Sequence, residues 1–191
     1  ELSDALVAAS FTAAGIAAHL GPDVTDALYR GEPGVVLAAT RGGSQLDGLI
    51  RALLLRRPVT GEELAEIFGP KLALSLIDAS VFTPTPCGDV EVAYDIRPHV
   101  LSGRDRLVIS DRDASVTQLV PGPDHVLGVG AASLSLLSAS PLTPVGRVLD
   151  LGTGSGVQAL AQAPAAGKVV ATDVHPRALE LAEATLTANG V

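Results

Sequence analysis

Apolar side chains in the first ninety residues recur at the spacing of α-helices, and glycine or proline separates one run from the next. The longest run predicts an Ala-rich helix over residues 2–19, which ends before Gly21 and Pro22. Further helices are predicted over residues 23–30, 33–40, 46–53, 62–68 and 71–79. This pattern predicts a mainly helical front part of the chain.

Two local signals organise the end of this helical part. Thr60 and Glu63 have the spacing of a capping box, which opens the helix at 62–68. Residues 81–85 and 91–96 flank a Pro-Cys-Gly turn and predict a β-hairpin. Helix, capped short helix, helix and hairpin follow one another as in a winged-helix domain. A small helical module that packs on its neighbour has the same order, and the sequence leaves both interpretations open.

The helix at 71–79 would be the recognition helix of a winged-helix domain. Reading DNA requires Arg, Lys, Asn or Gln along that helix. Apart from Lys71 at its start, Ser75 and Asp78, this segment is apolar. We therefore expect a buried helix and a structural or protein-contacting role.

The pattern changes from helices to strands near residue 100. Strands are predicted over 106–110 and 115–120, and Pro121-Gly122-Pro123 marks a boundary. The predicted parts are a helical, winged-helix-like accessory domain at 1–98, a β-strand connecting segment at 99–122, and the start of an α/β domain at 123–191.

The last part of the chain alternates strands and helices. An apolar strand at 147–151 runs into a glycine-rich loop at 152–156, and a helix follows at 157–163. A second strand at 168–173 leads into a long helix at 176–189. Such a βαβα unit implies a parallel sheet with right-handed crossovers, which is how a Rossmann-like domain begins.

The glycine-rich loop and the acid after the second strand predict a nucleoside-binding site. Glycine allows the backbone to approach a ligand, and the following helix presents free N–H groups. Asp173 ends the second strand, where a carboxylate can accept hydrogen bonds from ribose hydroxyls. The alternative is that Asp173 only caps the next helix.

The loop does not have the spacing of a dinucleotide site. That fingerprint requires G-x-G-x-x-G, and counting from Gly152 the third glycine position holds Val157. Asp150, two residues before the first glycine, would repel a pyrophosphate but suits a cationic, amine-bearing ligand. The sequence thus disfavours an NAD(P)-binding oxidoreductase, which we keep as the least favoured of the three functional interpretations considered below.

Asp-Leu-Gly-Thr-Gly-Ser-Gly at 150–156, followed by Thr-Asp-Val at 172–174, resembles motif I and the acidic motif of class I S-adenosylmethionine-dependent methyltransferases. The amino-acid sequence of the loop is similar to that of release-factor glutamine methyltransferases. Residues 126–137 resemble the pre-motif of small-domain methyltransferases that act on ribosomal RNA guanine. The resemblance implies S-adenosylmethionine as cofactor and N-methylation of a protein glutamine or of a nucleobase in RNA or DNA. The cofactor-binding residues that it implies are Asp150, Gly152, Thr153, Gly154, Gly156, Asp173 and Val174, with Gly128, Val129, Gly130, Ser133 and His125 at the cofactor's methionine end.

The resemblance covers about residues 124–191 and includes no catalytic motif. Those families hold the reacting nitrogen in an Asn/Asp-Pro-Pro-Tyr/Phe loop, and this sequence has no such tetrapeptide, so no catalytic residue is assigned. Because the chain starts at Glu1, contains no Met and predicts only two strands of the domain's sheet, we expect it to be part of a longer protein.

Charge, cysteine content and hydropathy limit which partners and which kinds of site the sequence predicts. With 13 basic and 21 acidic residues and a net charge of −8, strong non-specific nucleic-acid binding is disfavoured, although a local basic patch could still contact RNA or DNA. Cys87 is the only cysteine, and the four His lack metal-ligand spacing, so neither a disulfide nor a metal site is predicted. The front apolar stretch is expected to be too short to span a membrane and lacks a basic flank.

These observations favour a soluble, cytoplasmic methyltransferase that acts on a protein or ribonucleoprotein and has no membrane partner. The main alternative is a winged-helix, nucleic-acid-binding regulator whose α/β unit senses a ligand.

Overall fold

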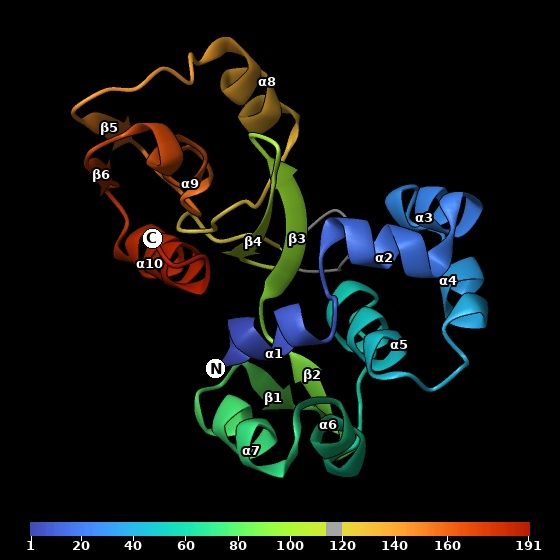
Figure 1. The fold of residues 1–191 in the computed structure, drawn as a ribbon. Helices are drawn as coiled ribbons and strands as arrows, with labels where there is room; N and C mark the ends of the chain where they lie inside the picture. Colours follow the sequence, from blue (N-terminus) through green and yellow to red (C-terminus); the bar gives the residue numbers. More distant parts are fainter. Residues whose placement is uncertain (114–119) are drawn as a thin grey trace. The chain divides into compact units, whose positions relative to one another are not determined.

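A computed structural model describes residues 1–113 and 120–191 of the chain. The predicted strand at 115–120 lies outside the described residues except for Val120, which is not in a strand. The chain divides into two compact units, residues 1–93 and 94–191 (Figure 1). The sequence placed the end of the helical domain at residue 98 and a connecting segment at 99–122. In the structure the division falls after Ala93.

The predicted front helix is two helices, α1 (Leu2–Ala8) and α2 (Ala13–Leu20). Ser10 between them has a positive φ of 58°, and the Thr12 hydroxyl accepts a hydrogen bond from the Gly15 N–H at 2.9 Å. The expectation of one continuous helix is wrong because a side-chain cap starts a new helix inside the apolar run. The helices α3 (Pro22–Tyr29) and α4 (Pro33–Ala39) follow.

Residues Leu2–Leu20 are long and apolar enough, by length and composition alone, to cross a membrane. This differs from the expectation that the stretch is too short. Core helices of soluble proteins and signal sequences share this length and composition.

Further helices and a β-hairpin complete the first unit. The helix α5 (Gln45–Leu49) continues as a π-helical turn, η1 (Ile50–Leu54), and α6 (Gly61–Phe68) and α7 (Pro70–Asp78) follow. The strands β1 (Phe82–Pro84) and β2 (Val90–Val92) pair antiparallel. The Thr60 capping box is confirmed, because Thr60 Oγ1 accepts from the Glu63 N–H at 3.1 Å and Glu63 Oε2 accepts from the Thr60 N–H at 2.8 Å.

Two expectations about this region need correction. The helix α7 is not buried as a whole: Ala73 and Leu76 are buried, whereas Leu74 is 64% exposed. Apolar residues extend around more of α7 than the face that packs against the rest of the first unit, so some of them are exposed. The predicted strand at 91–96 is also interrupted, since β2 ends at Val92 and a new strand begins at Asp95.

The second unit starts with a long antiparallel hairpin of β3 (Asp95–Leu101) and β4 (Arg104–Ser110). The two residues of its turn, Ser102 and Gly103, have positive φ angles of 50° and 73°, as in the type I′ turns that suit the twist of a hairpin.

The predicted parallel unit is present. The strands β5 (Val148–Leu151) and β6 (Val169–Thr172) pair in parallel and are joined through α9 (Val157–Gln162) and a short 3₁₀ turn, Ala163–Ala165. The helix α10 (Pro176–Ala188) comes after β6. The helix α8 (Ala131–Ala139) precedes β5.

The helices α9 and α10 both pack on the β3–β4 hairpin. Leu101 and Val108 of the hairpin form one buried cluster with Val157, Leu160 and Ala161 of α9. A second cluster joins Val126 to Ala178 and Leu181 of α10, with Ile109 packed against it. The hairpin therefore provides a common surface for α9, which follows the glycine-rich loop, and for α10, which follows β6.

Candidate functional site

The glycine-rich loop closes against the end of β6. The N–H groups of Gly152 and Thr153 both donate to the Thr172 carbonyl, at 2.8 and 2.9 Å. Gly152, Gly154 and Gly156 have φ angles of 77°, 54° and 81°, a region that strongly favours glycine. The alternation of glycines in the sequence thus corresponds to a backbone that turns sharply three times between β5 and α9.

Gly156 has a second reason to be glycine. It is the N-cap of α9, and a Cβ placed there would lie 3.2 Å from the Ala182 Cα on α10. This close approach lets α9 and α10 pack directly against each other behind the loop.

The Asp150 side chain bonds to the glycine-rich loop and to α9. Its Oδ2 accepts hydrogen bonds from the Thr153 hydroxyl at 2.7 Å and from the Ala159 N–H at 3.0 Å. The carboxylate therefore joins the loop to the first turn of α9. A direct contact of Asp150 with a ligand remains a prediction.

Asp173 lies on the other side of the loop, directly after β6. One carboxylate oxygen accepts from the Gly154 N–H at 3.0 Å and the other from the His175 N–H at 3.1 Å. These N–H groups lower the pKa of Asp173 from its ordinary value, the Gly154 bond having the largest effect. The Asp173 side chain thus bonds both to the loop and to the residue before α10. A role in binding ribose and a role at the start of α10 are therefore compatible.

A cavity of about 400 Å³ opens between the loop, the first turns of α9 and α10, the segment 124–128 and α8. This size falls within the range of small-molecule sites, roughly 300–1,000 Å³. The predicted residues that line it are His125, Gly128, Ser133, Gly152, Thr153, Gly154 and Asp173. The structure therefore brings the glycine-rich loop, the acid after β6 and the predicted pre-motif to one place.

Five predicted residues do not line this cavity: Val129, Gly130, Asp150, Gly156 and Val174. Val129 packs against the α9 core cluster and Val174 is 89% exposed. Asp150 and Gly156 shape the loop from behind, and Gly130 is the N-cap of α8. Their roles as direct ligand contacts stay predictions.

The charge of the cavity suits a cationic ligand. Asp124, Asp173, His125 and His175 are its ionisable lining residues, and none of the lining residues in the described part of the chain is Lys or Arg. A pyrophosphate would meet two carboxylates there without a basic partner, which agrees with the loop spacing in disfavouring a dinucleotide.

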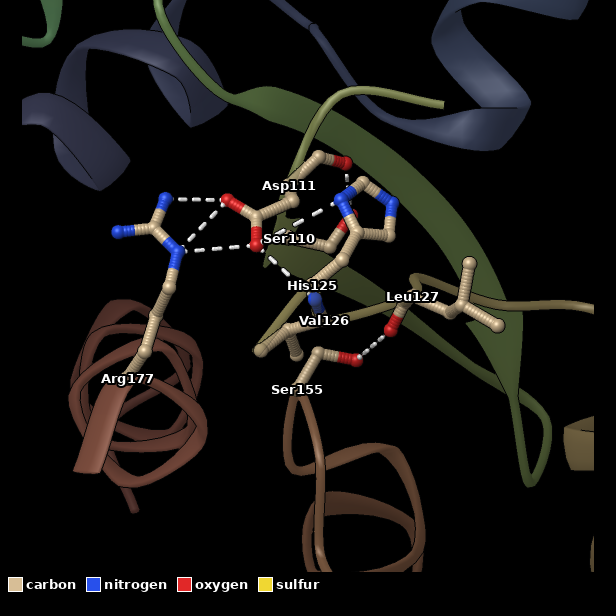
Figure 2. Close-up of polar contacts among 7 residues, drawn as sticks. All are labelled: Ser110, Asp111, His125, Val126, Leu127, Ser155 and Arg177. Carbon is tan, nitrogen blue, oxygen red and sulfur yellow. Dashed lines mark hydrogen bonds and ion pairs between the residues drawn. The ribbon is translucent and has the colours of Figure 1, made fainter. Parts of the chain in front are cut away.

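Figure 2 shows a polar cluster beside the cavity that sequence reasoning missed. Arg177 on α10 forms an ion pair with Asp111, which follows β4. His125 Nδ1 lies 3.9 Å from Asp111 Oδ2, and the Ser155 hydroxyl donates to the Leu127 carbonyl at 2.9 Å. Asp111 and Arg177 are 66 positions apart in sequence, so spacing could not have paired them.

The described residues contain no metal centre. Within 1–113 and 120–191, no three His, Cys, Asp or Glu side chains gather closely enough to hold a metal ion.

Comparison with known proteins agrees with this geometry. Residues 127–191 match the family model "Methyltransferase small domain", and residues 8–93 match a "Domain of unknown function (DUF7059)". The chain is 42% identical over 77 residues to a ribosomal protein L11 methyltransferase of Thermus thermophilus, covering 38% of this chain and 30% of that protein. It is 44% identical over 55 residues to the Pelobacter propionicus protein of the same name, covering 28% of this chain and 18% of that protein. The chain thus spans less than a third of either relative.

The parallel unit, the glycine-rich loop and the acid after β6, together with these matches, place the C-terminal part of the chain among the class I S-adenosylmethionine-dependent methyltransferases. Within that class, residues 127–191 match the methyltransferase small domain model, which confirms the resemblance seen in the sequence.

Proposed function

We propose that the protein binds S-adenosylmethionine in the cavity beside the glycine-rich loop and transfers its methyl group to a nitrogen atom. The observation that carries this proposal is Asp173, a carboxylate that directly follows β6 and lines the cavity together with Gly152 and Gly154. Each Asp173 oxygen already accepts one N–H bond and retains capacity for a ligand hydroxyl.

The cofactor, when bound, supplies an electrophilic methyl group on a sulfonium sulfur. Asp173 would accept hydrogen bonds from its ribose, and Gly128 and Ser133 lie on the side that the family resemblance assigns to its methionine end. The lack of Lys and Arg among the described lining residues suits the positive charge of that group. These residues bind and orient; the acceptor nitrogen must be held elsewhere.

We further propose a protein as methyl acceptor, in preference to a nucleobase. Two relatives are named for methylation of ribosomal protein L11, and the net charge of −8 disfavours nucleic acid. A glutamine amide, suggested by the loop wording alone, is one such acceptor. A ribonucleoprotein that presents a protein side chain, in the cytoplasm, is the setting that we propose.

The first unit is proposed to be a winged-helix-like accessory domain. The order α5–η1, α6, α7, β1, β2 supports this, as does an isolated antiparallel bridge that pairs Val59, before α6, with Val90 of β2. On α7, the position of a recognition helix, the exposed side chains include Lys71, Leu74 and Asp78. One cation, one acid and an apolar residue suit a protein surface better than DNA.

Calorimetric titration of the chain with S-adenosylhomocysteine and, separately, with NAD tests the cofactor assignment. We expect saturable binding of S-adenosylhomocysteine and none of NAD. Saturable NAD binding without S-adenosylhomocysteine binding would overturn the proposal and favour an oxidoreductase.

A further inference from the structure

The cavity is lined by three parts of the chain. One wall is the segment 124–128, a second runs from the glycine-rich loop to the first turn of α10, where His175 and Ala178 lie, and a third is formed by Ala132, Ser133 and Leu136 of α8. A ligand that fills the cavity would contact the first two walls, so its affinity depends on how firmly these two are held at the right distance from each other.

Asp111 binds the first wall. Its main-chain N–H donates to the Val126 carbonyl at 3.0 Å, and its Oδ2 accepts from the Val126 N–H at 2.9 Å (Figure 2). Both backbone polar groups of Val126 are therefore satisfied by one residue. Because Val126 lies in the middle of the wall, Asp111 fixes the wall's position relative to β4.

The same carboxylate binds α10. Arg177 Nε donates to Asp111 Oδ1 and Oδ2 at 3.0 and 2.9 Å, and a terminal nitrogen of Arg177 also bonds to Oδ1. The Asp111 side chain is only 10% exposed. Burial by itself would raise the pKa of Asp111, but the bonds from Arg177 and from the Val126 N–H outweigh it and lower the pKa from its ordinary value.

Arg177 is oriented from a second direction. Its guanidinium carbon lies 6.0 Å from the centre of the Tyr94 ring, a distance at which a cation is attracted to the ring face. Asp111 and Arg177 themselves are not among the residues that line the cavity. They are therefore placed to act on a ligand through the two walls that they connect.

We propose that Asp111 and Arg177 are positioning residues of the cofactor site, which join the 124–128 wall to the first turn of α10 and set the width of the cavity. The inference rests on the proposed function. A cavity held open in advance spares the ligand the cost of ordering its walls, and loss of one partner leaves the other as an uncompensated, partly buried charge.

The test compares the S-adenosylhomocysteine dissociation constants of Asp111→Asn, Arg177→Gln and Arg177→Lys with that of the unchanged chain. Asn189→Ala is the matched control, since Asn189 joins α10 to β4 through Leu107 and is not a lining residue. Thermal midpoints are measured on the same samples, and titrations are done well below them.

We expect Asp111→Asn and Arg177→Gln to weaken binding about tenfold or more. Arg177→Lys should recover part of the affinity, because lysine keeps the charge but not the two-point contact. Asn189→Ala should lower the thermal midpoint while leaving the dissociation constant within about twofold.

Two results would overturn the inference. If Asp111→Asn and Arg177→Gln lower only the thermal midpoint, the ion pair is purely structural. If Asn189→Ala weakens binding as much as they do, loss of stability in general is the cause. Failure of the unchanged chain to bind S-adenosylhomocysteine contradicts the proposed function instead, and this inference falls with it.

Discussion

At the scale of single residues, Asp173 combines two tasks. Its oxygens accept one N–H from the loop and one from the start of α10, and it still faces the cavity. We expect Asp173→Ala to weaken S-adenosylhomocysteine binding roughly 10- to 100-fold, from the loss of charge-assisted hydrogen bonds of about 1.5–3 kcal/mol.

Calorimetric titration measures this change, and Glu183→Ala provides a control because Glu183 is an exposed acid on α10, the helix that follows Asp173, and lies outside the cavity. An unchanged dissociation constant for Asp173→Ala would mean that the carboxylate acts only as a cap for α10.

Individual site residues differ in how far they could be predicted. Gly152, Gly154 and Asp173 were predictable, because a loop between strand and helix and an acid after the next strand are local in sequence. The pairing of Asp111 with Arg177 was not, since it depends on how β4 and α10 come together. Ser155, inside the glycine motif, gave no signal of its contact with Leu127.

At the scale of elements, side chains from α10 and its C-cap bond to the backbone of two residues of β4. On the edge that does not pair with β3, Asn189 accepts from the Leu107 N–H at 3.0 Å and donates to the Leu107 carbonyl at 2.7 Å. Thr185 bonds in the same two-way manner to Ile109, at 3.0 and 3.2 Å. Side chains of a helix thus take the place of a neighbouring strand, which protects an otherwise open sheet edge.

Asn189→Ala removes both bonds to Leu107 and should lower the free energy of unfolding by about 1–3 kcal/mol, because backbone groups lose their partners. Chemical denaturation gives this value, with Thr187→Ala, an exposed change on the same helix, as the comparison. Equal stabilities of the two variants would show that water replaces the amide without cost.

Element types were predicted better than element ends and faces. The capping box at Thr60 and the glycine-rich loop each have a local cause, and both appear in the structure. The break at Ser10 and the exposed side of α7 do not follow from the periodicity of apolar residues, since Ala and Leu fit either side of a helix. Tertiary packing decides which of them are buried.

At the scale of the whole molecule, acid should destabilise both units. Asp47 in the first unit and Asp111 and Asp173 in the second all have a lowered pKa. For Asp47, burial opposes the effect and the His19 and Ser44 hydrogen bonds outweigh it. Their contribution is complete above the ordinary carboxyl pKa, about 4, and is lost as the pH falls through the lowered values.

His99 adds to the same trend, because burial and then Arg97 lower its pKa. The unfolded chain takes up this proton from about pH 6.5 downward while the folded chain does not. We therefore expect the free energy of unfolding to decline gently below about pH 6.5 and steeply below about pH 4. Urea unfolding between pH 7 and pH 3.5 measures the curve, and Asp111→Asn should flatten its acid limb; an acid limb of unchanged slope would contradict the assignment.

The β3–β4 hairpin also bears on the order in which the second unit assembles. Its strands are adjacent in sequence and its turn of Ser102 and Gly103 has the backbone angles that hairpins favour, so little chain entropy is lost when it closes. The contacts of Thr185 and Asn189 with β4 span 76 and 82 positions, so we expect them to form later. The hairpin is then the template on which α10 docks, and the part of the cavity wall formed by His175 and Ala178 is in place only when α10 has docked.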